Sequence, residues 1–293
     1  MSSYAATGAT RAVPLWRDLL VLLKLRIDAL VVLVAVAGAV ASGETRPGRI
    51  GLLAAASFAA AAGASALNHY YERDTDALME RTRGRPLPSG RVMPATALVL
   101  GVTLISLSQL VVVPLGLGVG LYLLAGALTY ALVYTRWLKP RTPWATVWGG
   151  AAGSFAVLAG WQAHASTWRP APQLLAAVLF LWTPSHFWSF GIARAADYRR
   201  SPFPLLTSIL SPRRASTVVW ANTLGLVVTA TALGLWLRWP YLAVALPSGL
   251  WFARHALLLR SEPTPERGFA VFKRSGAYLL ALVAGLVLQS LVH

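Results

Sequence analysis

The sequence predicts an all-α membrane protein that crosses the bilayer several times. Three observations support this fold class. Of the 293 residues, 56% are hydrophobic and only 12% are charged, and the mean hydropathy is +0.58, which is too apolar for an ordinary soluble domain. The apolar residues also form runs of about 20, the length that a helix needs to span the hydrocarbon core. Finally, the basic residues gather in the short segments between these runs, as is typical of polytopic membrane proteins.

The runs predict about nine transmembrane helices surrounding a central cavity. Short loops that carry many of the basic residues separate them. At about 20 residues per span, the expected helices cover residues 20–42, 49–71, 92–114, 116–135, 144–163, 172–193, 215–237, 240–259 and 269–291.

The net charge of +16 would suggest a nucleic-acid partner in a soluble protein. Here most basic residues follow the second, fourth, sixth and eighth expected spans, so we assign the charge to membrane topology and expect no nucleic-acid partner. The positive-inside rule places the N-terminus and the mouth of the cavity on the cytoplasmic side, and the C-terminus outside. We expect residues 1–15 to form a short cytoplasmic tail and residues 16–293 a single transmembrane domain. The chain has no cysteine, which excludes thiolate chemistry and disulfides.

The first expected span contains charged residues near its start, namely Lys24, Arg26 and Asp28. Lys and Arg at such positions often extend their charged ends to the membrane surface. The other interpretation is that they face a polar site, because ionisable residues inside a span are often functional. The residues alone leave both interpretations open.

The end of the second expected span carries the main acidic cluster of the chain. If the helix continues, Asn68, Glu72 and Asp76 lie at i, i+4 and i+8, so one amide oxygen and two carboxylates share a face. Mg²⁺ prefers such oxygens and completes its shell with water and substrate phosphates. Arg81 and Arg85 follow closely, and guanidinium groups bind phosphate by paired hydrogen bonds. The alternative is that these acids and bases simply pair across a solvated loop.

These residues resemble a known sequence motif. The pattern of Asn68, Glu72 and Asp76, followed by Met-Glu-Arg-Thr-x-x-Arg-Pro-Leu from Met79, is similar to the first motif of the UbiA-type intramembrane prenyltransferases. Within that superfamily the continuation resembles the heme O synthases, also called protoheme IX farnesyltransferases. Glu72 stands where the family more often has Asp, so the carboxylate is kept on a longer side chain. The resemblance implies a diphosphate donor bound through Mg²⁺.

The segment after the fourth expected span contains Lys139 and Arg141. Both are candidates for additional contacts with the donor phosphates, facing the first motif across the cavity. The segment resembles the family's Tyr-Thr-x-x-Leu-Lys-Arg-x-Thr-Pro pattern. It departs from the family at Ala145, where Asn is expected, on a wall that the acceptor would contact.

The sixth expected span contains Pro184 and then His186 among aromatic residues. A proline inside a membrane helix bends it and is tolerated where a cavity or a neighbouring helix compensates. A single histidine on an apolar face is more often a hydrogen-bonded structural residue than a ligand. The segment resembles the Trp-Thr-Pro-x-His-Phe-Trp pattern of heme O synthases, and this resemblance makes His186 the candidate for heme binding.

Asp197 follows the same span and is the only carboxylate between Glu80 and Glu262. A surface salt bridge with neighbouring arginines is the simpler interpretation. Its match to an Asp-Tyr pair of the family implies a second metal or diphosphate site, with Arg200 as a further diphosphate contact. Ala196 stands where the family has an acidic residue, so this second site has fewer carboxylates than the family pattern.

Taken as a whole, the resemblance implies a prenyltransferase of heme biosynthesis. The donor would be farnesyl diphosphate, the acceptor a vinyl group of heme B, the product heme O and the cofactor Mg²⁺. The expected location is the inner (cytoplasmic) membrane, with the lipid bilayer as surroundings and oxidase-assembly proteins as candidate partners. Two alternatives remain open: a UbiA-type enzyme with another acceptor, such as a quinone precursor, and a non-catalytic heme-binding assembly protein.

Overall fold

The structure is a computed structural model that describes residues 14–199 and 202–292. Residues 1–13 of the expected tail lie outside this range. Within the described ranges every regular element is a helix. The elements are α1 (Leu15–Leu23), α2 (Leu25–Ala41), α3 (Pro47–Ala77), α4 (Pro94–Val111), the short 3₁₀-helix η1 (Val113–Leu115), α5 (Leu117–Leu128), the π-helix η2 (Thr129–Leu138), α6 (Ala145–Gly149), α7 (Ala151–Gln162), α8 (Pro170–Ala193), α9 (Ala195–Arg199), α10 (Leu206–Ile209), α11 (Pro212–Leu233), α12 (Trp239–Ser261) and α13 (Pro265–Leu291).

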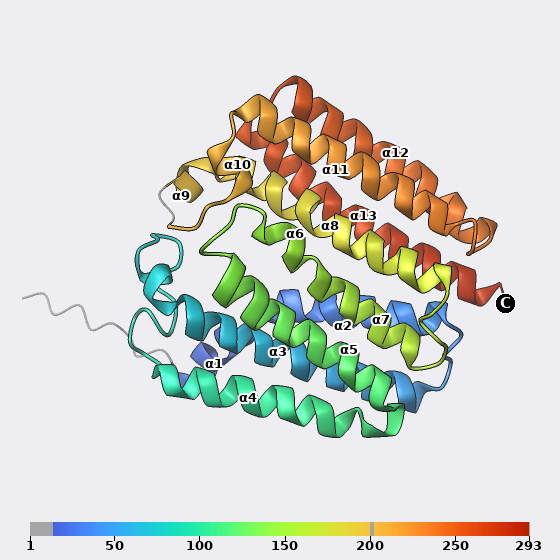
Figure 1. Ribbon diagram of the computed structural model, residues 1–293, viewed down its shortest axis with the longest axis horizontal. Coiled ribbons are helices and arrows are strands. Elements are labelled where there is room, and N and C mark those ends of the chain that lie inside the picture. The colour runs from blue at the N-terminus through green and yellow to red at the C-terminus, as the bar shows by residue number, and fades with distance from the viewer. Residues whose placement is uncertain (1–13, 200–201, 293) are drawn as a thin grey trace, which may run out of the picture.

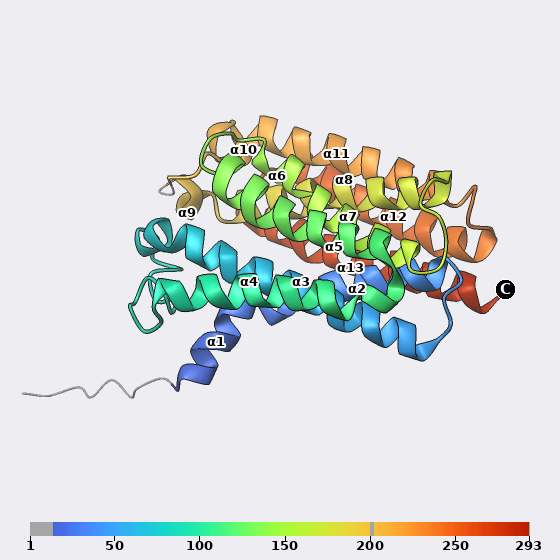
Figure 2. The ribbon, with the colours of Figure 1, turned by 60° about the horizontal axis from the view of Figure 1, so that its bottom comes forward.

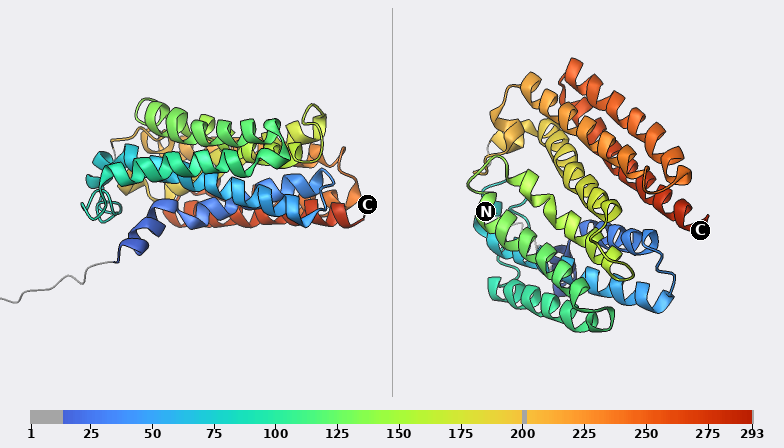
Figure 3. Two further views of the ribbon diagram at one scale, coloured as in Figure 1. Left: turned by 90° about the horizontal axis from the view of Figure 1, so that it is seen from below. Right: turned by 45° about the vertical axis from the view of Figure 1, so that its right-hand side comes forward.

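The long helices lie side by side along one axis (Figure 1). Helices α3, α4 and α5 form one side and α11 and α12 the other, with α2, α7, α8 and α13 between them. Helix α1 leaves the bundle at an angle, which Figures 2 and 3 show from two further directions. The C-terminal end of α3 and the short helices α9 and α10 lie at the same end of the bundle.

Seven of the described helical segments are long and apolar enough to cross a membrane. They confirm a multi-pass all-α protein, although the expected count of nine spans is not reached by this measure. The expected span at 20–42 is interrupted at Lys24, whose φ of +48° is left-handed and cannot continue a right-handed helix. The expected span at 144–163 is interrupted at Gly150, between α6 and α7. A Cβ on Gly150 would lie 2.6 Å from the carbonyl oxygen of Phe180, so this position requires glycine.

Helix α3 extends to Ala77, six residues beyond its expected end at residue 71. No proline or glycine occurs between residues 64 and 83, so nothing in the local sequence ends the helix earlier. Its 31 residues make it about 46 Å long, which exceeds the thickness of the hydrocarbon core of about 30 Å. The last turns of α3, with Glu72 and Asp76, can therefore reach the membrane surface.

Helices α2 and α7 pack with their backbones in close contact. A Cβ on Gly160 would overlap the carbonyl oxygen of Ala35, and one on Gly38 would lie 2.5 Å from the carbonyl oxygen of Val157. Small residues at such crossings allow membrane helices to approach closely. This contact fixes the position of α2, whose first turn reaches the candidate site.

A buried ionic cluster lies at the opposite end of the bundle from α9. The Glu44 carboxylate is only 2% exposed. It accepts hydrogen bonds from Arg46 Nε at 2.8 Å and from Arg49 Nε at 2.8 Å. Arg49 also donates to the carbonyl oxygen of Ala163 at 2.5 Å. The hydrogen bonds from Arg46 are the main cause that lowers the pKa of Glu44 from 4.5 to about 2. Because the pKa of Glu44 is lower in the folded state, the ionised carboxylate stabilises the fold. This contribution is present above about pH 4.5 and is lost as the pH falls through about 2.

Candidate active site

Asn68, Glu72 and Asp76 share one face of α3, as their spacing predicts. Their exposed fractions are only 1%, 5% and 2%, so the face is covered by neighbouring elements rather than by solvent. Two carboxylates that are this well buried need cationic or hydrogen-bonding partners. The partners come from three other parts of the chain.

Asn68 is held by three side chains. Its Oδ1 accepts a hydrogen bond from Lys24 Nζ, and its Nδ2 donates to Glu72 Oε1 at 2.9 Å and to Thr135 Oγ1 at 2.9 Å. Both ends of the amide are therefore used, which fixes its orientation. Lys24 thus points to the motif rather than to the membrane surface.

Each carboxylate of this face also contacts a cation. Lys139 Nζ donates to Glu72 Oε1, and Arg85 Nη1 lies 2.6 Å from Asp76 Oδ2. The sequence-predicted residues Lys139 and Arg85 therefore lie at the first motif, 67 and 9 positions away from their partners in the sequence. Together with Lys24 they surround the oxygen atoms with three positive charges.

The π-helix η2 positions the residues that face α3. Thr135 Oγ1 donates to the carbonyl oxygen of Tyr130 at 2.8 Å, and Tyr130 OH lies 3.3 Å from Lys24 Nζ. Short π-helical segments inside α-helices are frequent at functional sites. The sequence analysis did not identify Thr135 and Tyr130, because neither belongs to the charged motifs and a π-helix leaves no simple periodicity. For Thr135 the available signal was the Tyr134-Thr135 pair that opens the segment resembling the family pattern; Tyr130 had no such signal.

The first motif, on α3, and the Asp197-Tyr198 segment approach each other through Tyr198 on α9. Burial raises the pKa of the Tyr198 phenol, and the positive charges of Lys139 and Arg81 oppose this shift. The phenol therefore lies within electrostatic reach of the first motif and of the loop that follows it. Lys139 Nζ also lies 4.6 Å from the centre of the Phe203 ring, so the segment after α9 covers Lys139.

The remaining predicted site residues do not take part in these contacts with the α3 face. Asp197 on α9 is exposed, and no ion pair of Asp197 occurs among the described residues. Arg81 is exposed in the loop after α3. Arg141 donates to the carbonyl oxygen of Trp137 at 2.9 Å, close to its own position in the chain. Arg200 lies outside the described residues.

His186 lies in the contact between α8 and α13. Its ring stacks on Trp182 at 4.4 Å and contacts Phe272 at 4.4 Å, and its Nδ1 lies 2.7 Å from Ser275 Oγ. Ser275 Oγ donates its proton to the carbonyl oxygen of Phe272 at 2.7 Å, so we assign the proton of the imidazole to Nδ1. In this tautomer Nε2 carries the free lone pair that binds a metal. This geometry supports a structural role and leaves one nitrogen suited to ligation.

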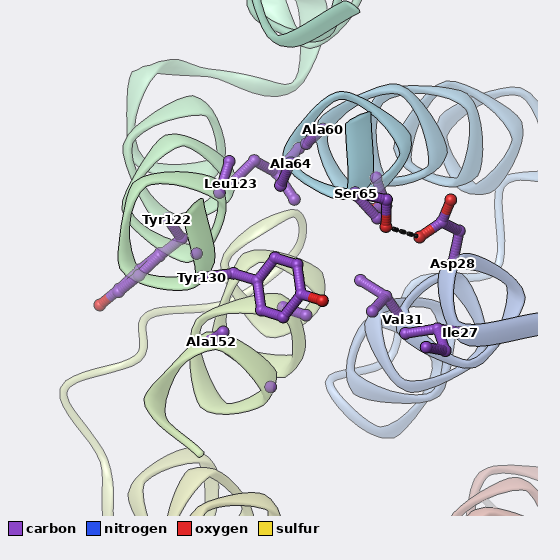
Figure 4. A pocket seen from close by; sticks show the side chains of 16 residues that line it. Ile27, Asp28, Val31, Ala60, Ala64, Ser65, Tyr122, Leu123, Tyr130 and Ala152 are labelled. Atoms are coloured by element: carbon purple, nitrogen blue, oxygen red, sulfur yellow. Dashed lines mark hydrogen bonds between the residues drawn. The ribbon is translucent and has the colours of Figure 1, made fainter. Parts of the chain in front are cut away.

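An apolar cavity lies between α2, α3, α5, η2 and α7 (Figure 4). The space inside it that a water-sized sphere can reach is about 80 Å³. Tyr130 forms part of its wall, as do Asp28 and Ser65. Because Tyr130 contacts Lys24, and Lys24 contacts Asn68, the cavity begins next to the polar face of α3. His186 is not part of its lining.

The donor atoms of the α3 face suit a magnesium ion that shares its ligand shell with a substrate. In the described part of the chain no group of three or more His, Cys, Asp or Glu side chains is arranged to hold a metal. The face instead offers two carboxylates and one amide oxygen. Mg²⁺ commonly binds one or two protein carboxylates and takes its other ligands from water and phosphate, so these residues fit it.

This combination defines the class of protein. A helical membrane bundle with carboxylates and cations at one end, adjoining an apolar cavity, is suited to a lipid with a diphosphate head. The sequence profile described as the UbiA prenyltransferase family matches residues 29–283, and the chain belongs to this family of enzymes.

Relatives and solved structures agree with this assignment. Protoheme IX farnesyltransferase 2 of Paramagnetospirillum magneticum is 35% identical over 274 residues, which cover 92% of this chain and 95% of that protein. Protoheme IX farnesyltransferase of Rhizorhabdus wittichii is 41% identical over 239 residues, 79% of this chain and 78% of that protein. The resemblance to heme O synthases found in the sequence is therefore confirmed.

Two solved structures have the same fold. A digeranylgeranylglyceryl phosphate synthase matches with a TM-score of 0.79 and 15% identity, covering 95% of this chain and 99% of that one. A UbiA homologue from Archaeoglobus fulgidus, bound to DMAPP and Mg²⁺, matches with a TM-score of 0.68 and 15% identity, covering 92% of this chain and 99% of that one.

Proposed function

We propose that this protein transfers the farnesyl group of farnesyl diphosphate to a vinyl group of heme B, which gives heme O. The observation that carries the proposal is the similarity to protoheme IX farnesyltransferases over nearly the whole chain, combined with the buried carboxylate, amide and cation face. The alternative acceptor, a quinone precursor, has no comparable support, because the relatives matched at this identity are named for protoheme. A heme-binding protein that catalyses no reaction would have no use for the carboxylates and cations on this face of α3.

The face of α3 and its cations would bind the diphosphate. Asn68, Glu72 and Asp76 would hold Mg²⁺, which supplies Lewis-acid stabilisation of the leaving pyrophosphate. Lys139 and Arg85 already lie at these oxygens and would donate hydrogen bonds to the phosphate oxygens as their negative charge grows. We assign supporting contacts to Arg81, Asp197 and Arg200, the last of which lies outside the described residues.

The apolar cavity would shield the reaction from water. Ionisation of an allylic diphosphate produces a carbocation, which bulk water would trap. The aromatic side chains beside the site, such as Tyr130 and Tyr134, whose rings stack at 5.8 Å, can stabilise positive charge by their electron-rich faces. The protein itself would therefore bind the head, separate the charges and align the acceptor.

We place the protein in the inner (cytoplasmic) membrane, with the N-terminus and the site on the cytoplasmic side. The support is the concentration of basic residues in the loops at that end, including Arg81, Arg83 and Arg85. Oxidase-assembly proteins remain candidate partners by resemblance.

The decisive experiment incubates membranes containing the protein with heme B, farnesyl diphosphate and Mg²⁺, and identifies the extracted hemes by mass spectrometry. We expect heme O to form, and its formation to stop when the metal is removed with a chelator. If heme B stays unchanged while the donor is consumed with a quinone precursor, the protein acts on another acceptor. If neither reaction occurs, the proposal is wrong.

His186 offers a separate test of heme binding. We propose that its Nε2 contacts or ligates the heme iron. His186→Phe keeps an aromatic ring between Trp182 and Phe272 but removes the nitrogen, so we expect weaker heme binding and a shifted Soret band in the purified protein. His255→Phe is the matched control. His255 packs beside Trp251 on α12, and its Nδ1 forms a hydrogen bond with the carbonyl oxygen of Trp251. An unchanged Soret band in His186→Phe would limit His186 to a structural role.

A further inference from the structure

Asp28 is a buried carboxylate that the proposed donor site does not use. It is 1% exposed; Oδ1 accepts a hydrogen bond from Ser65 Oγ at 2.9 Å, and Oδ2 has no partner in the described structure. An unpaired carboxylate oxygen inside a membrane bundle is costly. Such a group calls for an explanation, and a catalytic role is one of them.

Asp28 lies just beneath the polar face of α3. Its partner Ser65 is three residues before Asn68 on the same helix, so the two differ by about 4.5 Å along the helix axis. Asp28 also follows Lys24 by four residues, and Lys24 Nζ contacts Asn68. If the chain of a donor enters the cavity from a diphosphate on this face, its first carbon lies between the face and the cavity wall that contains Asp28.

Asp28 also belongs to the wall of the apolar cavity, which Figure 4 shows together with Ser65 and Tyr130. Most of the lining is Ala, Gly, Val, Leu and Ile, which excludes bulk water. A water molecule admitted here would find few polar partners apart from the Asp28 carboxylate and nearby hydroxyl groups.

The backbone break at Lys24 sets the position of Asp28. Because Lys24 is left-handed, a new helix begins at Leu25, and Asp28 lies in its first turn with its N–H bonded to the carbonyl oxygen of Lys24 at 3.2 Å. A carboxylate in the first turn of a helix is stabilised by the helix dipole. The same break that directs Lys24 to Asn68 thus places the Asp28 carboxyl group in the wall of the cavity.

The proposed reaction needs such a group, and the argument here rests on the proposed function. Heme O carries a hydroxyethylfarnesyl group, so a water molecule must be added together with the farnesyl group. The C–O bond of the donor breaks and its electron pair leaves with pyrophosphate. The vinyl π electrons form the new C–C bond, which leaves a cation on the vinyl carbon next to the porphyrin ring. Water then attacks that carbon, and its proton needs an acceptor.

We propose that Asp28 is a catalytic residue that orients the attacking water through Oδ2 and accepts its proton. Ser65 is a positioning residue that holds Oδ1. The overall balance is heme B, farnesyl diphosphate and water giving heme O, pyrophosphate and one proton, with no oxidation or reduction. Without Asp28 to hold the water, the same cation would lose a proton from the neighbouring carbon to the released pyrophosphate and give an alkene instead of the alcohol.

The test compares wild type with Asp28→Asn, which keeps an oxygen for the Ser65 hydrogen bond. Both proteins receive heme B, farnesyl diphosphate and Mg²⁺ in water enriched in heavy oxygen, and the hemes are identified by mass. We expect wild type to form heme O with the label in its hydroxyl group. In Asp28→Asn we expect the ratio of heme O to the product lacking one water to fall by about 10²-fold, with pyrophosphate release continuing.

Three further variants complete the experiment. Asp28→Glu keeps the carboxylate and should recover part of the heme O. Ser57→Ala removes the other unpartnered oxygen of the cavity wall and should keep the product ratio of wild type. Ser65→Ala replaces Asp28→Asn if the latter does not fold, as judged by thermal unfolding, and should shift the ratio in the same direction by a smaller factor.

The outcomes separate this inference from the proposed function. If wild type forms heme O and neither Asp28→Asn nor Ser65→Ala changes the product ratio, Asp28 is not the base, while the function stands. The same conclusion follows if the two products decrease equally, since that indicates a structural role, or if the hydroxyl group carries no label. If wild type forms no farnesylated heme at all, both proposals fail.

Discussion

Replacing Glu72 with glutamine is expected to lower kcat at saturating farnesyl diphosphate by about 10²–10³-fold, the cost typical of losing one charge-stabilising group at a reaction centre. Glutamine keeps an oxygen to accept from Asn68 Nδ2, so the shape of the site is preserved. It removes the negative charge that would bind the metal and that now neutralises Lys139. The measurement is heme O formed per unit time in membranes with equal amounts of protein.

Two controls make this result specific. Glu72→Asp restores the carboxylate that the resembling family more often has here, and we expect it to recover much of the activity. Asp74→Asn changes a neighbouring acid whose side chain is 81% exposed, and we expect nearly wild-type rates. A Glu72→Gln enzyme as active as wild type, or an equal loss in Asp74→Asn, contradicts the assignment of the site to this face of α3.

Replacing Gly160 with alanine is expected to lower the free energy of unfolding by about 3 kcal/mol, at the upper end of overpacking effects. The added Cβ overlaps the carbonyl oxygen of Ala35, and this is backbone that no rotamer change can move aside. Helices α2 and α7 must separate, which also moves Lys24 and Asp28. The measurement is thermal unfolding of the purified protein in detergent, together with heme O formation.

The matched control is Gly225→Ala in α11, where the added Cβ meets no atom within 4 Å. Because alanine has the higher helix propensity, this change should be neutral or stabilising by about 0.5–1 kcal/mol. If Gly160→Ala unfolds at the same temperature as wild type, then α2 and α7 can separate without cost and the contact does not hold the site.

Much of the fold could be predicted from sequence because apolar length dominates membrane helices. The runs predicted the seven long spans. The breaks could not be predicted in the same way, because Gly150 packs against the backbone of α8 at Phe180 and Lys24 bonds to Asn68 on α3. The spacing of Asn68, Glu72 and Asp76 indicated their common face, since no residue before Ala77 stops α3. The hydrogen bonds of Thr135 and Ser65 could not be predicted, because they depend on how η2 and α2 pack against α3.

Each of the three residues on the α3 face pairs one oxygen with a cation, and this has a consequence for how ligands would bind. If these residues bind the metal and the diphosphate as proposed, a metal ion alone would have to displace Lys139 and Arg85 from the carboxylates, and a diphosphate alone would have to draw the same cations away from them. Binding of both would let the carboxylates pair with the metal and the cations pair with the diphosphate. Each ligand would then raise the affinity of the other, and thermodynamic reciprocity requires the two factors to be equal. Such a site would discriminate against free phosphate and against stray divalent ions, and would respond to the metal–diphosphate pair.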